Sequence, residues 1–261
     1  MSTIGDRMLL GFLVLIVIAT VTGPLLVADA AATVGAGYSA ASPGLPLGTD
    51  GLGRDVWTRL LAGGSGLLLV ALVSTVAAVV IGVAFGLVLT TRRPAAKALG
   101  IVLNLLLVIP SMLTMMVLVF GLGSGVSTMV LIMAVASVPF VARFTRSIAI
   151  PVIASEYVLA ARAGGDSWPV IFVREVLPNL GPPILADAGA RFIGSLYLVA
   201  AAGFLGFSPL GSDNDWATMV QSGLEGLTLN PWASLAPALA IAGITIPANL
   251  LVDRAMRRTL R

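Results

Sequence analysis

Apolar residues run in long stretches along this chain, and short clusters of charged residues, glycines and prolines separate them. A helix that crosses a membrane needs about 20 mostly apolar residues. Six stretches fit a crossing helix, and the fourth is short unless it extends past Arg143. They are Met8–Ala28, Gly66–Thr91, Ala98–Leu122, Ser127–Ala142, Ala188–Phe207 and Leu235–Val252. The pattern therefore predicts an all-α, polytopic membrane protein with six transmembrane helices.

Composition agrees with this pattern. Hydrophobic residues make up 58% of the chain and charged residues 10%, whereas a soluble domain carries about 25% charged residues. Because the apolar stretches are spread along the whole length, we expect one domain embedded in the lipid bilayer. Residues 1–65 would hold the first helix and an extracytoplasmic segment, and residues 66–261 a core of five helices.

The basic residues gather on one side of the predicted helices, which is typical of the cytoplasmic side. The opposite side carries Arg54 and Arg59 among several acidic residues. The cytoplasmic set consists of Arg7, Arg92, Arg93, Lys97, Arg143, Arg146, Arg162, Arg174, Arg254, Arg257, Arg258 and Arg261. This distribution predicts that both termini lie in the cytoplasm, and it accounts for the basic pI of 9.9 without nucleic acid.

The first apolar stretch has an alternative interpretation as a secretory signal. Arg7 precedes it, and the sequence ADA at 28–30 fits an A-x-A cleavage site. The apolar core of a signal is usually 7–15 residues long, and this stretch is longer. We therefore expect a retained first helix.

Missing residue types exclude several kinds of chemistry. The chain has no Cys and no His, which excludes thiolate chemistry, Ser-His-Asp catalysis and His-ligated zinc. The single lysine, Lys97, follows Ala96, so there is no GxxxxGK[ST] phosphate-binding loop. We expect neither an enzyme nor a bound cofactor or metal.

The most polar part of the second half is the segment 156–183, EYVLAARAGGDSWPVIFVREVLPNLGPP. Ser155 is placed to cap a short helix that runs through Ala163, and Gly164 and Gly165 provide a permissive stop. Asp166 would cap a second helix, which tolerates Pro169 in its first turn and ends at Pro178. This pattern predicts two short helices at the cytoplasmic surface, and composition alone favours an amphipathic connector.

The order of residues in this segment resembles the EAA loop of permeases from ABC importers. Ala160, Ala161, Gly165, Leu177 and Pro178 stand at matching positions, while Leu159 replaces a Glu and Glu175 replaces an Ile. The resemblance implies that the loop, within residues 150–183, is a coupling helix seated in a groove of a cytoplasmic ATPase. The residues given this role are Glu156, Ala160, Ala161, Arg162, Gly164, Gly165, Arg174, Glu175, Leu177 and Pro178.

Further motifs resemble the second permease of dipeptide and oligopeptide ABC importers. They are GTDGLGRDVWTRLLAGG at 48–64, IPSMLTMMVLVFGLGSG at 109–125, FLGF at 204–207 and PWASLAPALAIAGITIPANLLVDR at 231–254. Asn104 stands where the subfamily usually has Asp, and Val199 and Gly203 stand where it has Glu and Ser. The resemblance covers nearly the whole chain and implies the type I ABC-importer permease fold in a bacterial cytoplasmic membrane.

This resemblance implies a role and a set of partners. The chain would form a pathway for di- or oligopeptides together with a second homologous permease. Two cytoplasmic ATPase subunits, or one fused ATPase chain, would drive it, and an extracytoplasmic substrate-binding protein would deliver the substrate. Related permeases carry nickel, metal chelates or haem, so these substrates stay open. An alternative from another class is a stand-alone channel or secondary transporter.

Polar residues within and beside the helices are candidates for the pathway. Asp187 and Arg191 are four residues apart, which fits either a structural ion pair or a gating role. Asn104 and Pro110 either line the pathway or shape the third helix. Gly82 and Gly86 indicate close helix packing. In the last outer loop, Asp213, Asp215, Trp216 and Glu225 are candidates for docking the binding protein.

Overall fold

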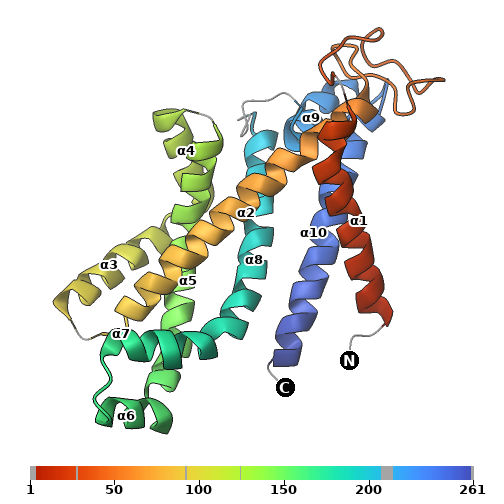
Figure 1. Ribbon diagram of the computed structural model, residues 1–261. Coiled ribbons are helices and arrows are strands. Elements are labelled where there is room, and N and C mark those ends of the chain that lie inside the picture. The colour runs from red at the N-terminus through yellow and green to blue at the C-terminus, as the bar shows by residue number, and fades with distance from the viewer. Residues whose placement is uncertain (1–3, 28, 92, 124, 207–213, 260–261) are drawn as a thin grey trace.

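The computed structural model describes residues 4–27, 29–91, 93–123, 125–206 and 214–259, and every regular element in them is helical (Figure 1). The long helices are α1 (Ile4–Leu26), α2 (Val56–Val88), α3 (Pro94–Val108), α4 (Ser111–Leu122), α5 (Val126–Ile153), α8 (Leu177–Phe204) and α10 (Trp232–Thr259). The shorter ones are α6 (Glu156–Ala163), α7 (Trp168–Ile171), the π-helical turn η1 (Phe172–Val176), α9 (Trp216–Gly223) and the 3₁₀ turn η2 (Leu224–Gly226).

The described helices bear out the predicted spans, with one break. Five helices are long and apolar enough to cross a membrane, and α3 with α4 makes a sixth if the bent pair counts as one span. An unbroken helix over Ala98–Leu122 is wrong, because α3 and α4 meet at 95°. Pro110 has no N–H group and forces Ile109 into an extended conformation, φ −78° and ψ 122°, which ends α3.

The fourth span is longer than Ser127–Ala142, because α5 continues to Ile153. Arg143 and Arg146 belong to this helix, and both side chains are exposed. Long basic side chains extend their charge toward water while the helix continues beneath them. The span predicted from hydropathy alone therefore stops about three turns before the end of this helix.

Helix α2 is the centre of the fold and packs most extensively on α5, with further contacts to α8 and α1. Gly82 and Gly86 lie on the buried face of α2. A Cβ at Gly82 would lie 2.5 Å from Cβ of Val141 on α5. The close packing predicted from the G-x-x-x-G spacing is confirmed, and it joins two helices of the same chain.

Replacing Gly86 by valine is expected to lower the stability of the protein by about 1–3 kcal/mol, because the added side chain overpacks this contact. A Cβ at Gly86 would lie 2.5 Å from Cβ of Thr145 and 2.7 Å from the carbonyl oxygen of Ala142. Thermal unfolding in detergent measures the effect. Gly11→Ala is the control, since nothing lies within 4 Å of that position. Equal unfolding temperatures for the two variants would contradict the packing.

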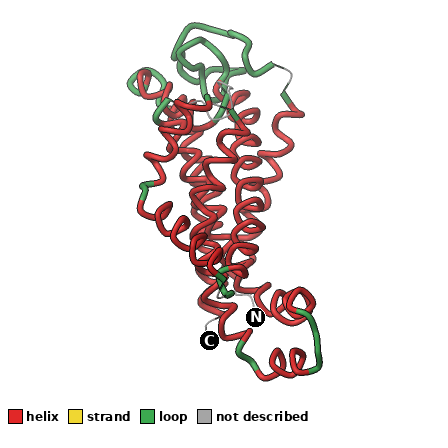
Figure 2. The backbone as a smooth tube through the Cα atoms, turned by 90° about the vertical axis from the view of Figure 1, so that its left-hand side faces the viewer, coloured by secondary structure: helices red, strands yellow, loops and turns green. Residues whose placement is uncertain are grey.

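Both ends of the described chain lie at the same end of the molecule as α6 and α7, and most of the loop between α1 and α2 lies at the opposite end (Figures 1 and 2). Helices α1 and α10 lie side by side. Near the termini, Arg254 Nη1 is 2.5 Å from Asp6 Oδ1. The molecule thus has a hairpin end and a loop end, separated by the spanning helices.

Candidate functional site

The predicted hairpin is present, and its first helix ends in a complete Schellman motif. Helix α6 ends at Ala163 as predicted, and Gly165 has a φ of +94°, which favours glycine. The N–H of Gly165 donates to the carbonyl of Arg162 at 3.1 Å, and that of Asp166 donates to Ala161 at 3.2 Å. These two bonds satisfy carbonyls at the end of the helix and fix the direction of the corner.

Two predicted caps in the hairpin differ from the structure. Ser155 precedes α6, but its hydroxyl donates to the carbonyl of Val152 at 2.6 Å and caps no N–H of the helix. The residue before α7 is Ser167 rather than Asp166, and Pro169 occupies the first turn as predicted. The hydroxyl of Ser155 therefore stabilises the end of α5, and the glycine corner places the next helix one residue later than expected.

The expectation that Pro178 ends the second helix is wrong. Helix α7 continues through the π-helical turn into α8, and Pro178 lies in the first turn of α8. Pro178 has no N–H to donate back along the helix, and the π-helical turn directly before it is where the helix departs from the regular α pattern. The N–H of Leu177 donates to Phe172, five residues earlier, and Asn179 Nδ2 donates to the carbonyl of Glu175 at 2.6 Å. The hairpin is therefore joined to the fifth span without a loop.

A small apolar core holds the hairpin to the spanning helices. Val158 of α6 and Ile171 of α7 are buried against Ala149 of α5 and Leu180 of α8. Trp168 stacks on Phe172 with ring centroids 5.4 Å apart, and the guanidinium of Arg162 lies 4.8 Å from the Trp168 ring. The apolar core thus packs the hairpin against α5 and α8.

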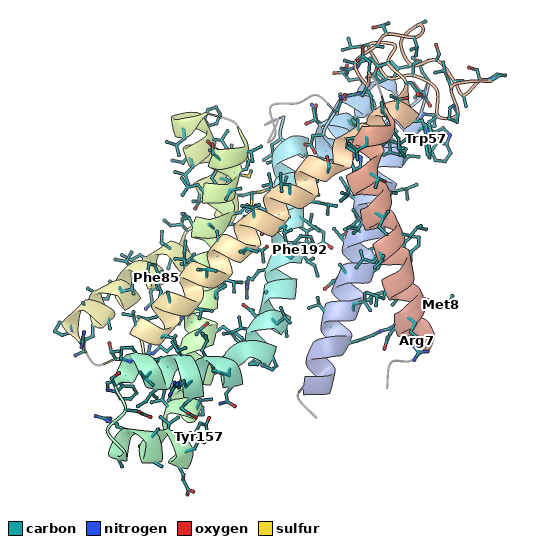
Figure 3. The ribbon with its side chains drawn as sticks, in the orientation of Figure 1. Arg7, Met8, Trp57, Phe85, Tyr157 and Phe192 are labelled. Carbon is teal, nitrogen blue, oxygen red and sulfur yellow. The ribbon has the colours of Figure 1, made fainter. Side chains whose placement is uncertain are left out.

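The predicted coupling residues lie mostly on the outer face of this hairpin. Tyr157 projects from α6 near the foot of the molecule (Figure 3) and is 45% exposed. The exposed members of the predicted set are Glu156, Ala160, Arg162, Gly164, Gly165, Arg174, Leu177 and Pro178, while Ala161 and Glu175 are half-buried. The hairpin thus presents a surface of small and charged residues away from its apolar core.

At the opposite end, residues 29–55 form an ordered outer segment held by a buried charge network. Asp50 accepts a 2.8 Å bond from Nε of Arg54 and is paired with Nη1 of Arg59. Arg59 is almost completely buried and also donates to Asn214 Oδ1 at 3.0 Å. Burial alone raises the pKa of Asp50, but hydrogen bonds from Arg54 and the charge of Arg59 outweigh it, so this pKa lies below its usual value.

The outer segment is also fastened to the start of α10 and to α9. The side-chain amide of Asn230 donates to the carbonyls of Leu47 and Thr49, both at 2.9 Å. The hydroxyl of Tyr38 donates to the carbonyl of Ser222 at 3.0 Å. Residues far apart in the sequence therefore form one structured cap, which the sequence reasoning missed.

The predicted docking residues have different surroundings. Asp213 lies outside the described residues. Asp215 and Trp216 are buried, and Trp216 Nε1 donates to the carbonyl of Leu60 at 2.7 Å, so their side chains do not form the exposed docking surface that the sequence suggested. Because both residues stand at the start of α9, their side chains point into the protein. Glu225 is exposed and stays a docking candidate.

Replacing Asp215 by asparagine is expected to reduce the pH dependence of stability. Burial raises the pKa of Asp215 to about 6 from 3.8, and its Oδ1 accepts no hydrogen bond from the described residues. As the pH rises, the carboxyl group stays protonated to a higher pH in the folded state than in the unfolded chain. The stabilisation that comes from this raised pKa is therefore fully present below pH 4 and is lost as the pH rises through 6. Between pH 5 and 7 the loss is about 1 kcal/mol. Thermal unfolding measures it, and an equal slope in the variant would contradict this environment.

The pathway candidates fall into two groups. Asn104 is exposed on α3, and Pro110 stands at the bend between α3 and α4. Asp187 and Arg191 form an ion pair on α8, with Nη2 3.0 Å from Oδ1. The guanidinium of Arg191 also lies 5.0 Å from the ring of Phe140 on α5. Sequence reasoning missed Phe140, because nothing in the spacing joins it to Arg191.

Comparison with known proteins identifies the family. Residues 78–261 match the family described as binding-protein-dependent transport system inner membrane component. The chain belongs to this family. It is thus a multi-pass permease subunit of an ABC importer, and the predicted class is confirmed.

Individual relatives agree with the family. The permease is 32% identical to the di/tripeptide transport system permease protein DppC of Pseudomonas aeruginosa (strain UCBPP-PA14), over 79% of this chain and 69% of that protein. It is 32% identical to the peptide transport system permease protein SapC of Escherichia coli O6:H1, over 81% of this chain and 72% of that protein. Its fold resembles the inward-facing MetNI methionine ABC transporter, with a TM-score of 0.60 and 19% identity over 79% of this chain and 94% of that one.

Proposed function

We propose that this permease is one of two homologous subunits that together form a pathway for di- and oligopeptides. The names of the relatives support the substrate class, since both DppC and SapC are described as peptide permeases. The motifs at 48–64, 204–207 and 231–254 favour the same subfamily. The second permease would cover faces of the spanning helices that carry many exposed apolar side chains in the single chain.

The structure of the hairpin α6–α7 is the main support for the proposed coupling mechanism. Its small and charged outer face fits a groove in a cytoplasmic ATPase, and its apolar core joins that surface to α5 and α8. Two ATPase subunits, or one fused chain, would hydrolyse ATP and displace the hairpins. Because α7 runs without a loop into α8, a displacement of the hairpin would tilt this helix and open or close the pathway.

The topology follows from this assignment. The hairpin end, which also carries both ends of the described chain (Figure 2), would face the cytoplasm. The outer segment 29–55 and the exposed Glu225 would face an extracytoplasmic binding protein that delivers the peptide. Asp50, Arg54 and Arg59 would keep this surface in one shape.

Peptide uptake by cells tests the proposal. Cells that lack this permease are expected to lose ATP-dependent uptake of radiolabelled Ala-Ala-Ala and to regain it when the chain is restored. Uptake of nickel and haem is measured in the same cells. Loss of nickel or haem uptake with unchanged peptide uptake would contradict the peptide assignment while leaving the importer assignment in place.

A further inference from the structure

The ion pair of Asp187 and Arg191 lies within a spanning helix. The first residues of α8 run along the hairpin end of the molecule (Figure 1), and Arg191 is eight residues beyond Pro183 and 13 before the end of α8 at Phe204, which places it about 12 Å along the helix from the proposed cytoplasmic surface and about 20 Å from the opposite end. Ionisable side chains at such depth are costly, and they mark substrate or ion pathways when they are retained. The ion pair lowers the energetic cost of placing both charges inside the membrane. It does not explain why Arg191 is the more exposed partner.

The orientation leaves the cation accessible. The side chain of Arg191 is 28% exposed and that of Asp187 is 11% exposed. Asp187 accepts bonds from Nη2 at 3.0 Å and from Nε at 3.3 Å. In the part of the chain that the structure describes, Nη1 of Arg191 has no hydrogen-bond partner, so its two N–H groups are available to another acceptor. The pair therefore presents donors rather than a carboxylate.

Phe140 connects this cation to the bend between α3 and α4. One of its contacts is the guanidinium of Arg191 at 5.0 Å. The same residue lines a cavity of about 170 Å³ together with Leu106, Pro110 and Thr114. Pro110 has no N–H, so the carbonyl of Leu106 loses its usual partner four residues on. Irregular backbone at membrane depth is tolerated where it lines a water-filled cavity or is covered by protein.

Arg191 and its neighbour Phe192 face different surroundings. Phe192 lines a separate apolar cavity with Val17 of α1 and Leu68 of α2, and it is marked on α8 in Figure 3. Arg191 contacts α5 instead. The guanidinium of Arg191 is thus directed toward α5, whereas Phe192 faces α1 and α2.

We infer that Arg191 binds the C-terminal carboxylate of a peptide in the pathway, and that the cavity at the α3–α4 bend receives an adjoining apolar side chain. A guanidinium pairs with a carboxylate through parallel N–H donors, which suits this end group. Asp187 and Phe140 are positioning residues, because they hold the guanidinium from two sides. The inference rests on the peptide transport proposed above.

Direct binding to the assembled permeases and ATPases, without the binding protein, tests this site. Radiolabelled Ala-Ala-Ala is bound to the purified assembly and displaced by unlabelled Ala-Ala-Ala or by its C-terminal amide. The amide is expected to compete about tenfold more weakly, because it lacks the charge that Arg191 binds. Arg191→Gln is expected to weaken binding of the free peptide about tenfold and to abolish the difference between the two peptides.

Matched variants separate this role from a structural one. Arg191→Lys keeps the charge and should retain most of the preference, whereas Arg93→Gln removes an exposed charge in the α2–α3 link and should change nothing. If Arg191→Gln does not assemble, Phe140→Leu takes its place, with a loss of affinity of about threefold expected. Equal competition by the two peptides, or no binding to the native assembly, would overturn the site. The uptake assay in cells would still decide the proposed function separately.

Discussion

Peptide uptake through an importer that carries Gly165→Trp in this subunit is expected to fall about tenfold or more, while ATP hydrolysis continues. Gly165 has a φ of +94°, and no atom lies within 4 Å of the position of its Cβ. The variant therefore inserts and folds, but a non-glycine residue in this conformation costs about 1–2 kcal/mol. The strain shifts the hairpin corner, and the indole ring occupies the surface offered to the ATPase.

The measurement is the number of peptides carried per ATP hydrolysed in proteoliposomes. Gly181→Ala is the matched control, since Gly181 lies in the helical backbone of α8 and nothing lies within 4 Å of the position of a Cβ there. Undiminished uptake by Gly165→Trp would remove the reason for assigning the coupling role to this hairpin.

Replacing Asp50 by alanine is expected to destabilise the protein by about 3–5 kcal/mol, the cost of removing one partner from a buried ion pair, because Arg54 and Arg59 both lose the carboxylate that they share. The Arg59 side chain is only 2% exposed. Thermal unfolding of the purified assembly in detergent measures the loss. Asp29→Asn in the same outer segment changes an exposed acid and should shift stability by no more than about 0.5 kcal/mol. Similar unfolding of the two variants would contradict the buried network.

Much of the membrane architecture could be predicted from local sequence signals. Apolar stretches located the spans, and Gly164 with Gly165 marked the corner of the hairpin, because these signals act within one or two turns of a helix. The bend at Pro110 was harder to predict, because proline in a membrane helix produces either a kink or a complete break. The extension of α7 into α8 depended on a π-helical turn, which has no simple pattern in sequence.

The outer cap and the Arg191 site could not be predicted, because they depend on residues distant in sequence. Arg59 meets Asn214, and Asn230 meets Thr49, across more than 150 residues in each case. The pair Asp187–Arg191 was visible from its spacing, but Phe140 enters only once α5 and α8 are packed. Trp216 was a docking candidate because it stands in the last outer loop, whereas the fold uses it to join α9 to α2.

Co-purification from mild detergent tests the central claim most directly. The chain is tagged at its C-terminus, and the proteins that accompany it are identified. The account predicts recovery of a second, homologous permease together with one or two P-loop ATPases, and loss of the ATPases when the hairpin residues 156–178 are replaced by a flexible linker. A chain that is recovered alone and still moves solute in liposomes would contradict the account and establish a stand-alone channel or secondary transporter.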